Sequence, residues 1–146
     1  MLGIGLIISS VLIYYLSPPV FSLIQDRIDS ELKLASKMGL QICESNLNYL
    51  LELRLENNPE MNAALRKEAV EEVKGISRQF QKVHMLVVED NRTILGSSLN
   101  VEKAGFDFPK FDRKRTDIVT KDLWGNTVRM QSLYFHFWNL QIVSFI

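Results

Sequence analysis

The sequence of 146 residues contains one cysteine, no excess of either charge, and no charged side chain among its first 25 residues. A single cysteine, Cys43, excludes an intramolecular disulfide and a zinc site built from several thiolates. The 17 acidic and 17 basic side chains cancel, so no bulk field attracts nucleic acid or anionic lipid. We therefore expect no nucleic-acid partner, and we interpret Cys43 as a packing residue.

Catalytic and metal-binding signatures are also missing. The two histidines, His84 and His136, fall on expected strands and belong to no HExxH or His-x-His pattern. No G-x-S-x-G sequence marks a nucleophile, although a triad assembled from distant residues would leave no such mark. The glycines of "LGIGLI" lie in an apolar leader and not between a strand and a helix, so they form no phosphate loop. We expect no metal, no cofactor and no enzymatic activity in this chain.

Residues 1–25, "MLGIGLIISSVLIYYLSPPVFSLIQ", form one long uncharged run. Such a run can cross a hydrocarbon core, which takes about 20 apolar residues. Pro18 and Pro19 interrupt it, and a helix can kink or restart there. A cleaved signal peptide is one alternative, but the run lacks a basic n-region and an A-x-A-like site. A buried core helix is another. We expect a transmembrane anchor over residues 1–25 and a folded domain over residues 26–146; with no Lys or Arg before the run, its orientation stays open.

The pattern becomes amphipathic from Asp26 to about Glu56. Its apolar residues recur at helical spacing: Ile28, Leu32, Ala35, Met38, Ile42, Tyr49 and Leu53. This spacing predicts one long helix that continues from the anchor. The stretch "ENNPE" should end it, because Asn58 is a good N-cap and Pro59 a favoured first residue of a second helix. The second helix should run to about Gln81.

Five short β-rich segments follow the helices. They are residues 83–89, 93–98, 115–122, 127–138 and 140–146, with the last two meeting near Asn139. The first, "VHMLVVE", has apolar residues on both faces, which is typical of a central strand covered on both sides. The predicted fold class is α+β: a membrane anchor running into a long helix, a second helix, and an antiparallel sheet of about five strands.

The fourth strand sorts its side chains onto two faces, because successive residues alternate across a sheet. One face, expected to pack on the helices, carries Leu133, Phe135 and Phe137. The other carries Met130, Ser132, Tyr134, His136 and Trp138. This second face mixes aromatic bodies with hydroxyl, imidazole and indole groups, a combination typical of small-molecule pockets. An ordinary half-exposed sheet face is the alternative interpretation.

Two further residues flank the junction between the second helix and the first strand. Arg78 and His84 can reach such a pocket or can cap the helix end, where cations suit the dipole. The candidate ligand-binding residues are therefore Arg78, His84, Met130, Ser132, Tyr134, His136 and Trp138. The basic cluster at residues 110–115 is interpreted as a solvated loop, with a role toward an anionic ligand as the alternative.

Three stretches carry a resemblance to a known family. "RKEAVEEVKGISRQF", "VHMLVVEDNRTILGSS" and "TDIVTKDLWGNTVRMQSLYFHFWNLQIVSFI" resemble the Cache class of extracytoplasmic sensor domains, PAS-like folds of bacterial histidine kinases, chemoreceptors and diguanylate cyclases. The resemblance covers about residues 20–146 and consists of strand and turn patterns. At the first hairpin the family often has D-x-x-G, whereas "EDNRT" lacks the glycine. No amino-acid-recognition motif is matched, so the ligand class is not transferred.

The resemblance implies a function in signal transduction. The domain would lie in the periplasm or outside the cell, held in the cell membrane by its N-terminal helix, and would bind a small molecule. Ligand binding would shift a conformational population and relay the change to a cytoplasmic output module that this sequence does not contain. Such receptors usually act as dimers through the first helix, which implies a homodimer through residues 28–53.

Two other protein classes remain as alternatives. A membrane-anchored ectodomain that only docks a partner or dimerises, without ligand, has the same anchor and helix pattern. A type IV pilin-like subunit also begins with an apolar helix that continues into an amphipathic one. Pilins carry a glutamate five residues into the mature helix, whereas here no acidic residue precedes Asp26.

Overall fold

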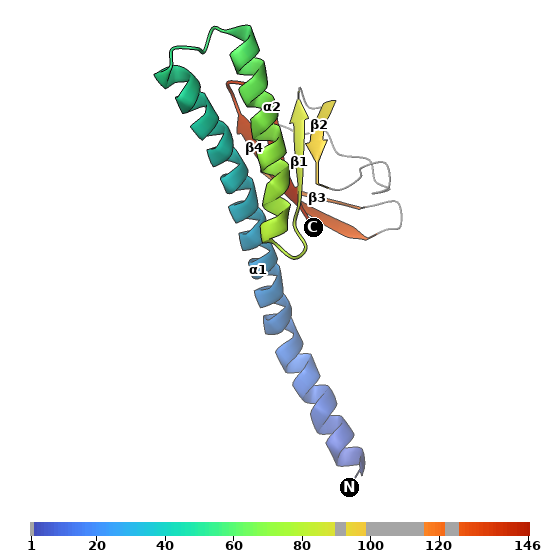
Figure 1. Cartoon of the computed structure of the whole chain (residues 1–146). Coiled ribbons are helices and arrows are strands. Elements are labelled where there is room, and N and C mark those ends of the chain that lie inside the picture. Colours follow the sequence, from blue (N-terminus) through green and yellow to red (C-terminus); the bar gives the residue numbers. More distant parts are fainter. Residues whose placement is uncertain (1, 90–92, 99–115, 122–125) are drawn as a thin grey trace. The chain divides into compact units, whose positions relative to one another are not determined.

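The computed structural model describes residues 2–89, 93–98, 116–121 and 126–146 (Figure 1). The basic cluster at residues 110–115 lies outside them. The described chain has two helices followed by a five-stranded antiparallel sheet, which confirms the predicted α+β layout. It divides into two compact units, residues 1–30 and residues 31–146.

The N-terminal unit is helical and apolar. It contains the beginning of helix α1, whose bounds are Leu2–Glu52, and the helix continues through Pro18 and Pro19. The fixed φ of proline near −65° is a helical value, so two prolines remove hydrogen bonds without forcing the helix to end. All side chains from residue 6 to residue 24 are exposed within this unit. Among the described residues, α1 is the one helix long and apolar enough to cross a membrane.

In the second unit, α1 buries one side of its surface against the rest of the domain. The buried side chains are Leu32, Ala35, Ser36, Cys43 and Leu50. Leu32 and Ala35 of the predicted apolar face are thus buried, whereas Tyr49 and Leu53 are about half exposed (50% and 48%), and Cys43 and Leu50 continue the buried side.

Helix α1 ends in a left-handed residue. Arg54 has φ 54°, the Arg54 N–H donates to the Leu51 carbonyl, and the Leu55 N–H donates to the Leu50 carbonyl. This pair of bonds is a Schellman motif, which satisfies carbonyls that a helix end otherwise leaves unpaired. The helix therefore ends at Glu52, slightly before the "ENNPE" stretch.

Helix α2, Pro59–Gly75, begins as predicted. The Asn58 side chain accepts hydrogen bonds from the Glu60 and Met61 N–H groups, both at 3.1 Å, and Pro59 is the first helical residue. The expected continuation to Gln81 was wrong in detail: after Gly75 the chain forms the short 3-10 helix η1, Ile76–Gln79.

The five strands pair in the order β2-β1-β5-β4-β3, and every neighbouring pair is antiparallel. Their bounds are β1 His84–Glu89, β2 Thr93–Ser97, β3 Asp117–Lys121, β4 Thr127–Phe135 and β5 Leu140–Phe145. The sheet is therefore centred on the last strand, and all six residues of β5 are buried. The first strand is also covered on both sides, as predicted, with Met85 to Val88 buried.

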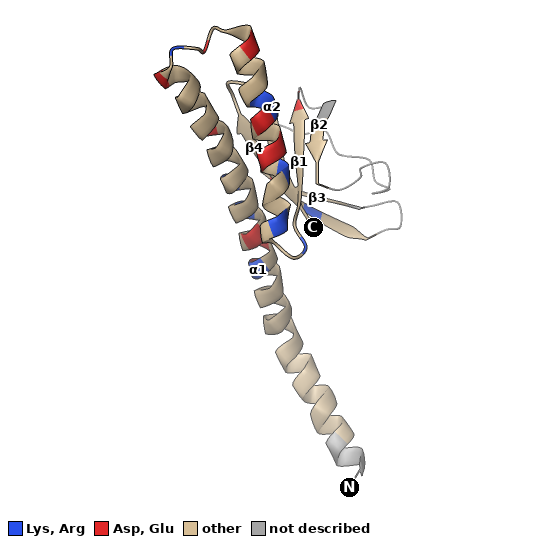
Figure 2. Ribbon diagram, in the orientation of Figure 1, with Lys and Arg blue, Asp and Glu red and all other residues tan. Residues whose placement is uncertain are grey.

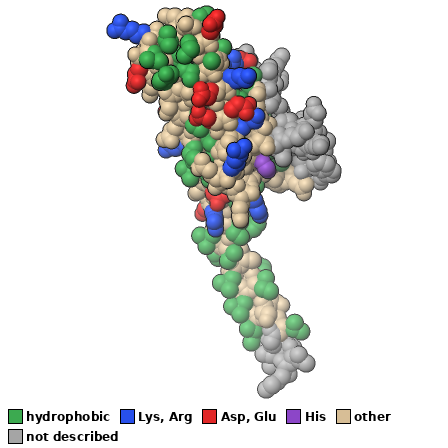
Figure 3. All heavy atoms as spheres, in the orientation of Figure 1, with side chains coloured by type: hydrophobic (Ala, Val, Ile, Leu, Met, Phe, Trp, Pro, Cys, Tyr) green, Lys and Arg blue, Asp and Glu red, His purple; other side chains and the backbone are tan. Residues whose placement is uncertain are grey.

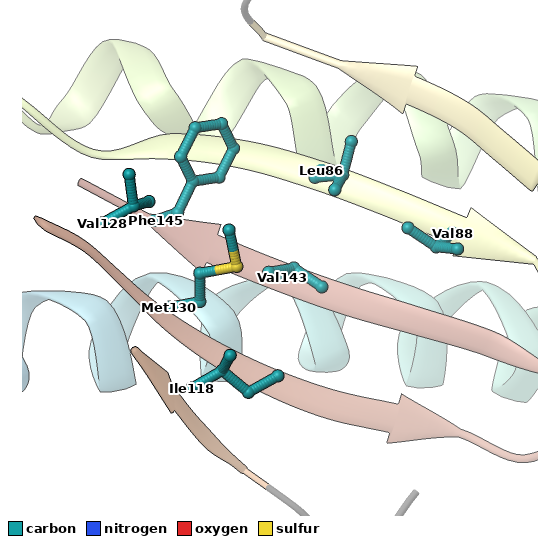
Figure 4. Packing of buried hydrophobic residues seen from close by; sticks show 7 residues of the cluster. All are labelled: Leu86, Val88, Ile118, Val128, Met130, Val143 and Phe145. Carbon is teal, nitrogen blue, oxygen red and sulfur yellow. The ribbon is translucent and has the colours of Figure 1, made fainter. Parts of the chain in front are cut away.

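The two faces of the sheet have different neighbours. The helices pack on one face: a methyl group placed at Gly39 of α1 would lie 2.6 Å from Ile142 Cγ2 and 3.6 Å from Met85 Cε. The opposite face, here called the outer face, carries a buried apolar cluster: Leu86, Val88, Ile118, Val128, Met130, Val143 and Phe145. Figure 4 shows these side chains on the side of the sheet away from the helices.

Candidate functional site

The outer face is built by the register of three adjacent strands. Met130 of β4 lies opposite Phe145 of β5, and Ser132 lies opposite Val143. Val143 in turn lies opposite Leu86 of β1. Because residues two apart on a strand share a face, one surface gathers these side chains from β1, β5 and β4.

Four predicted site residues belong to this face. Met130, Ser132 and Tyr134 alternate along β4 as expected, and His84 begins β1 in the same register. The His84 ring lies 5.5 Å from the ring of its cross-strand partner Phe145. The structure therefore brings together a hydroxyl, a phenol and an imidazole around an apolar cluster.

The placement of Trp138 on this face was wrong. Its indole Nε1–H donates to Asn62 Oδ1 of α2 at 2.6 Å, and its ring lies 5.4 Å from that of Phe135. Trp138 is buried in these contacts and therefore belongs to the helix-facing side. The reason is that β4 ends at Phe135, so the strict alternation of side chains stops before residue 138.

His136 and Phe137 also fall in the turn after β4 and not on a strand. His136 is exposed, with its ring 5.9 Å from the Tyr134 ring. Phe137, which was expected to pack on the helices, is 41% exposed. The turn closes through Asn139 at φ 53°, a left-handed conformation that asparagine tolerates better than most residues.

Arg78 is not brought to the outer face. It lies on η1 with an exposed side chain, after the end of α2. Of the seven predicted residues, the sheet therefore assembles four, and the other three lie in the turn or on η1.

The residue that sequence reasoning missed is Gln141, on β5. It is 1% exposed, it lies opposite Tyr134 and Val88, and its Oε1 accepts a hydrogen bond from Ser132 Oγ at 2.6 Å. Its Nε2 is buried without a hydrogen-bond partner among the residues that the structure describes. The signal in the sequence is a polar residue inside the otherwise apolar start of "LQIVSFI". From the sequence, the side chains of β4 are assigned to the two faces of the sheet, but those of this segment are not.

The outer face is nearly free of charge. The charged strand residues with described side chains are Glu89, Asp117 and Arg129, and each alternates onto the opposite side from its neighbour on the outer face. Glu89 is paired with Arg66 of α2, which confirms that it points toward the helices. Of the titratable groups described on the strands, His84 and Tyr134 remain on the outer face.

A groove of about 1050 Å³ lies between α1 and α2, and it has a mixed apolar and polar lining from α1, α2 and η1. The apolar part of the lining consists of Met38, Ile42, Tyr49, Met61, Ala64, Leu65 and Ile76. The polar part consists of Gln41, Ser45, Asn46, Glu68, Glu72 and Gln79. Figure 2 shows acidic and basic residues along the ribbon of α2, and Figure 3 shows hydrophobic side chains gathered near the end of α1 and the start of α2.

Cys43 is confirmed as a packing residue in its burial. The side chain is 1% exposed, and burial, followed by the nearby Glu44 and Glu72 carboxylates, raises the pKa of its thiol to about 12. A thiol with such a pKa carries almost no thiolate at neutral pH. The thiol of Cys43 is therefore a poor nucleophile in the folded chain.

Within the described parts of the chain, no three His, Cys, Asp or Glu side chains are grouped to hold a metal ion. No protein-family model, no curated protein and no solved structure matches the chain.

Proposed function

We propose that the chain is the extracytoplasmic ligand-sensing domain of a Cache-class transmembrane receptor, and that the ligand binds on the outer face of the sheet. The observation that carries this proposal is the outer face itself. It combines a buried apolar cluster with one buried amide–hydroxyl pair, Gln141 and Ser132. A mainly apolar wall with few polar groups is the usual composition of a small-molecule site.

The fold supports the same assignment. Two helices precede a five-stranded antiparallel sheet, which is the layout expected for a PAS-like sensor domain, and the first and last strands are adjacent in that sheet. The apolar start of α1 supports a membrane anchor. In the proposal this helix lies in the inner (cell) membrane, and the domain lies in the periplasm or outside the cell.

The contacts between β5 and α1 supply a route for the signal. The Ser144 hydroxyl donates to the Leu32 carbonyl at 2.7 Å, and Ile142 packs against the backbone of α1 at Gly39. Gln141 and Val143 lie on the same strand but face the ligand side. A ligand that prefers one position of β5 therefore biases the position of α1, the helix whose apolar beginning is the proposed anchor.

The proposed receptor is a homodimer through residues 28–53. The apolar residues of this segment divide between two surfaces: Leu32 and Ala35 are buried in the domain, whereas Met38, Ile42 and Tyr49 line the groove beside α2. The groove thus leaves part of the segment available to a second copy. Sedimentation of the full chain in detergent tests this, and monomer at every protein concentration contradicts it.

The ligand-sensing proposal is tested by thermal unfolding of the full chain in lipid nanodiscs against a library of small metabolites. A ligand that binds the folded state stabilises it by about 2.7 kcal/mol at a hundred times its Kd. We expect at least one saturable shift that is lost in Ser132→Ile, which removes the hydroxyl and fills the outer face. Thr127→Ile at the exposed start of the same strand is the control and should keep the shift.

A ligand-free interaction ectodomain is the second candidate, and the groove between α1 and α2 favours it. The sensor requires a ligand on the outer face, whereas the interaction ectodomain requires none. If the library produces no shift, while Tyr49→Glu in the groove abolishes self-association, the interaction module replaces the sensor.

A further inference from the structure

The side chain of Gln141 is unusual for its position. It lies on the central strand of the sheet, where every residue is buried, and its neighbours on the outer face include Leu86, Val88 and Val143. A primary amide offers two N–H donors and one carbonyl acceptor. Within the described parts of the chain, the acceptor is used by the Ser132 hydroxyl and Nε2 has no partner. A buried donor without a partner is costly, so its retention in a central strand calls for a partner.

The described polar groups beside Gln141 are committed elsewhere. The Ser132 hydroxyl proton is committed to Gln141 Oε1, and the Tyr134 hydroxyl donates to Asn139 Oδ1 at 2.6 Å. Ser132 therefore fixes the orientation of the amide, with Nε2 as the free end.

The charge of the site restricts what Nε2 can bind. The charged strand residues with described side chains lie on the opposite side of the sheet. Among the described side chains of this face no cation is available to a carboxylate placed beside Gln141, whereas a neutral carbonyl oxygen needs only one or two donors. The surrounding apolar cluster adds a preference for an apolar body.

We infer that the outer face recognises a neutral, largely apolar small molecule through its carbonyl oxygen, with Gln141 Nε2 as the donor and Ser132 as the residue that positions the amide. This inference rests on the proposed ligand-sensing function and adds the chemical class of the ligand.

The test uses the full chain, labelled with nitrogen-15, in lipid nanodiscs. The probes are matched five-membered rings that differ in one group: cyclopentanone, cyclopentanecarboxylate, cyclopentylamine and methylcyclopentane. We expect cyclopentanone to move the Gln141 side-chain amide resonances saturably. It should bind at least tenfold more tightly than methylcyclopentane or the carboxylate, because an unfilled buried donor penalises ligands without an acceptor.

Three variants separate recognition from structure. Gln141→Leu should abolish the preference for cyclopentanone over methylcyclopentane. Gln131→Leu is the matched control, because Gln131 is also buried on a central part of the sheet but faces the helices; it should keep the preference. Ser132→Ala should weaken the preference, and Ser132→Thr, which retains the hydroxyl, should restore it.

Each contrary result overturns a specific statement. If cyclopentanone leaves the Gln141 amide resonances unmoved in the wild-type chain, or if Gln141→Leu binds it equally well, the inference is wrong. Preferred binding of cyclopentylamine would mean that the amide presents Oε1 instead of Nε2, and it overturns the carbonyl class. A library ligand that stabilises the chain without touching Gln141 leaves the sensor proposal standing and removes this inference alone. Because the resonance shifts are read on the wild-type chain, a variant that fails to fold does not remove the test.

Discussion

On the helix-facing side of the sheet, the Ser144 hydroxyl reaches the Leu32 carbonyl and Gly39 allows α1 to approach Ile142 closely. Gln141 directly precedes Ile142 on the same strand and lies on the outer face. Its amide nitrogen is buried without a partner among the described residues. The helix-facing side is therefore held by close contacts between β5 and α1, whereas the outer face carries a buried amide nitrogen beside an apolar cluster. In the proposed receptor, the outer face would bind the ligand and the helix-facing side would relay the change to α1.

The largest effect should come from breaking the close approach at Gly39. In Gly39→Val, a Cβ 2.6 Å from Ile142 Cγ2 and a branched side chain force α1 away from the sheet. We expect the free energy of unfolding, measured by urea denaturation, to fall by about 3 kcal/mol.

Gly75→Ala is the matched control, because a Cβ at Gly75 meets nothing within 4 Å and its φ is −66°. It should leave the free energy of unfolding unchanged or raise it by about 0.5 kcal/mol. Equal losses in the two variants would contradict the assigned role of Gly39 in helix–sheet packing.

The next effect concerns Trp138, which the sequence pattern assigned to the binding face. Trp138→Phe removes the indole donor from Asn62 Oδ1 and should cost about 1–3 kcal/mol in thermal or urea unfolding. Phe137→Tyr in the same turn, at a 41% exposed position, should stay within about 0.5 kcal/mol. A Trp138→Phe chain with unchanged stability but altered ligand selectivity would return Trp138 to the binding face.

The Trp138 error shows where sequence reasoning reached its limit. The helix start at Asn58 and Pro59, and the existence of all five strands, follow from local capping chemistry and β-rich runs, which act within a few residues. The end of β4 does not, because His136 to Trp138 are as aromatic as the strand before them and the left-handed turn at Asn139 lacks a glycine.

Gln141 was missed for a different reason. Its residue type is visible in the sequence, but its meaning depends on the register that sets it beside Ser132 across two strands, and on the burial of both. Pairing of distant strands is decided by tertiary packing and not by local propensity. A polar residue in a buried strand can be recognised from the sequence. Its hydrogen-bond partner, or the lack of one, cannot.

A smaller effect is expected at the link between β5 and α1. Ser144→Ala removes one buried hydrogen bond to the Leu32 carbonyl, which still accepts from Ser36 Oγ at 3.0 Å. The net loss should be about 1 kcal/mol in urea unfolding. The control is Ser45→Ala, at an exposed position on α1, which should change the free energy of unfolding by less than about 0.5 kcal/mol. If Ser144→Ala also abolished the preference for cyclopentanone, ligand recognition would not be confined to the outer face.

The smallest effect on stability belongs to Cys43, whose reactivity reports how tightly the helix-facing side is closed. Its thiol pKa is raised from 9.0 to about 12, so at pH 8 the folded chain holds about a thousandfold less thiolate than the unfolded chain. A thiol-specific reagent should therefore modify the native chain far more slowly than the urea-unfolded chain.

At pH 7 the thiol of Cys43 is protonated in both states and contributes nothing to stability. As pH rises from about 9 toward 12 only the unfolded chain releases this proton, so the contribution of Cys43 to stability falls. Fast modification of the native chain at pH 8 would show that α1 leaves the sheet readily, which would remove the contrast between a closed face and a binding face.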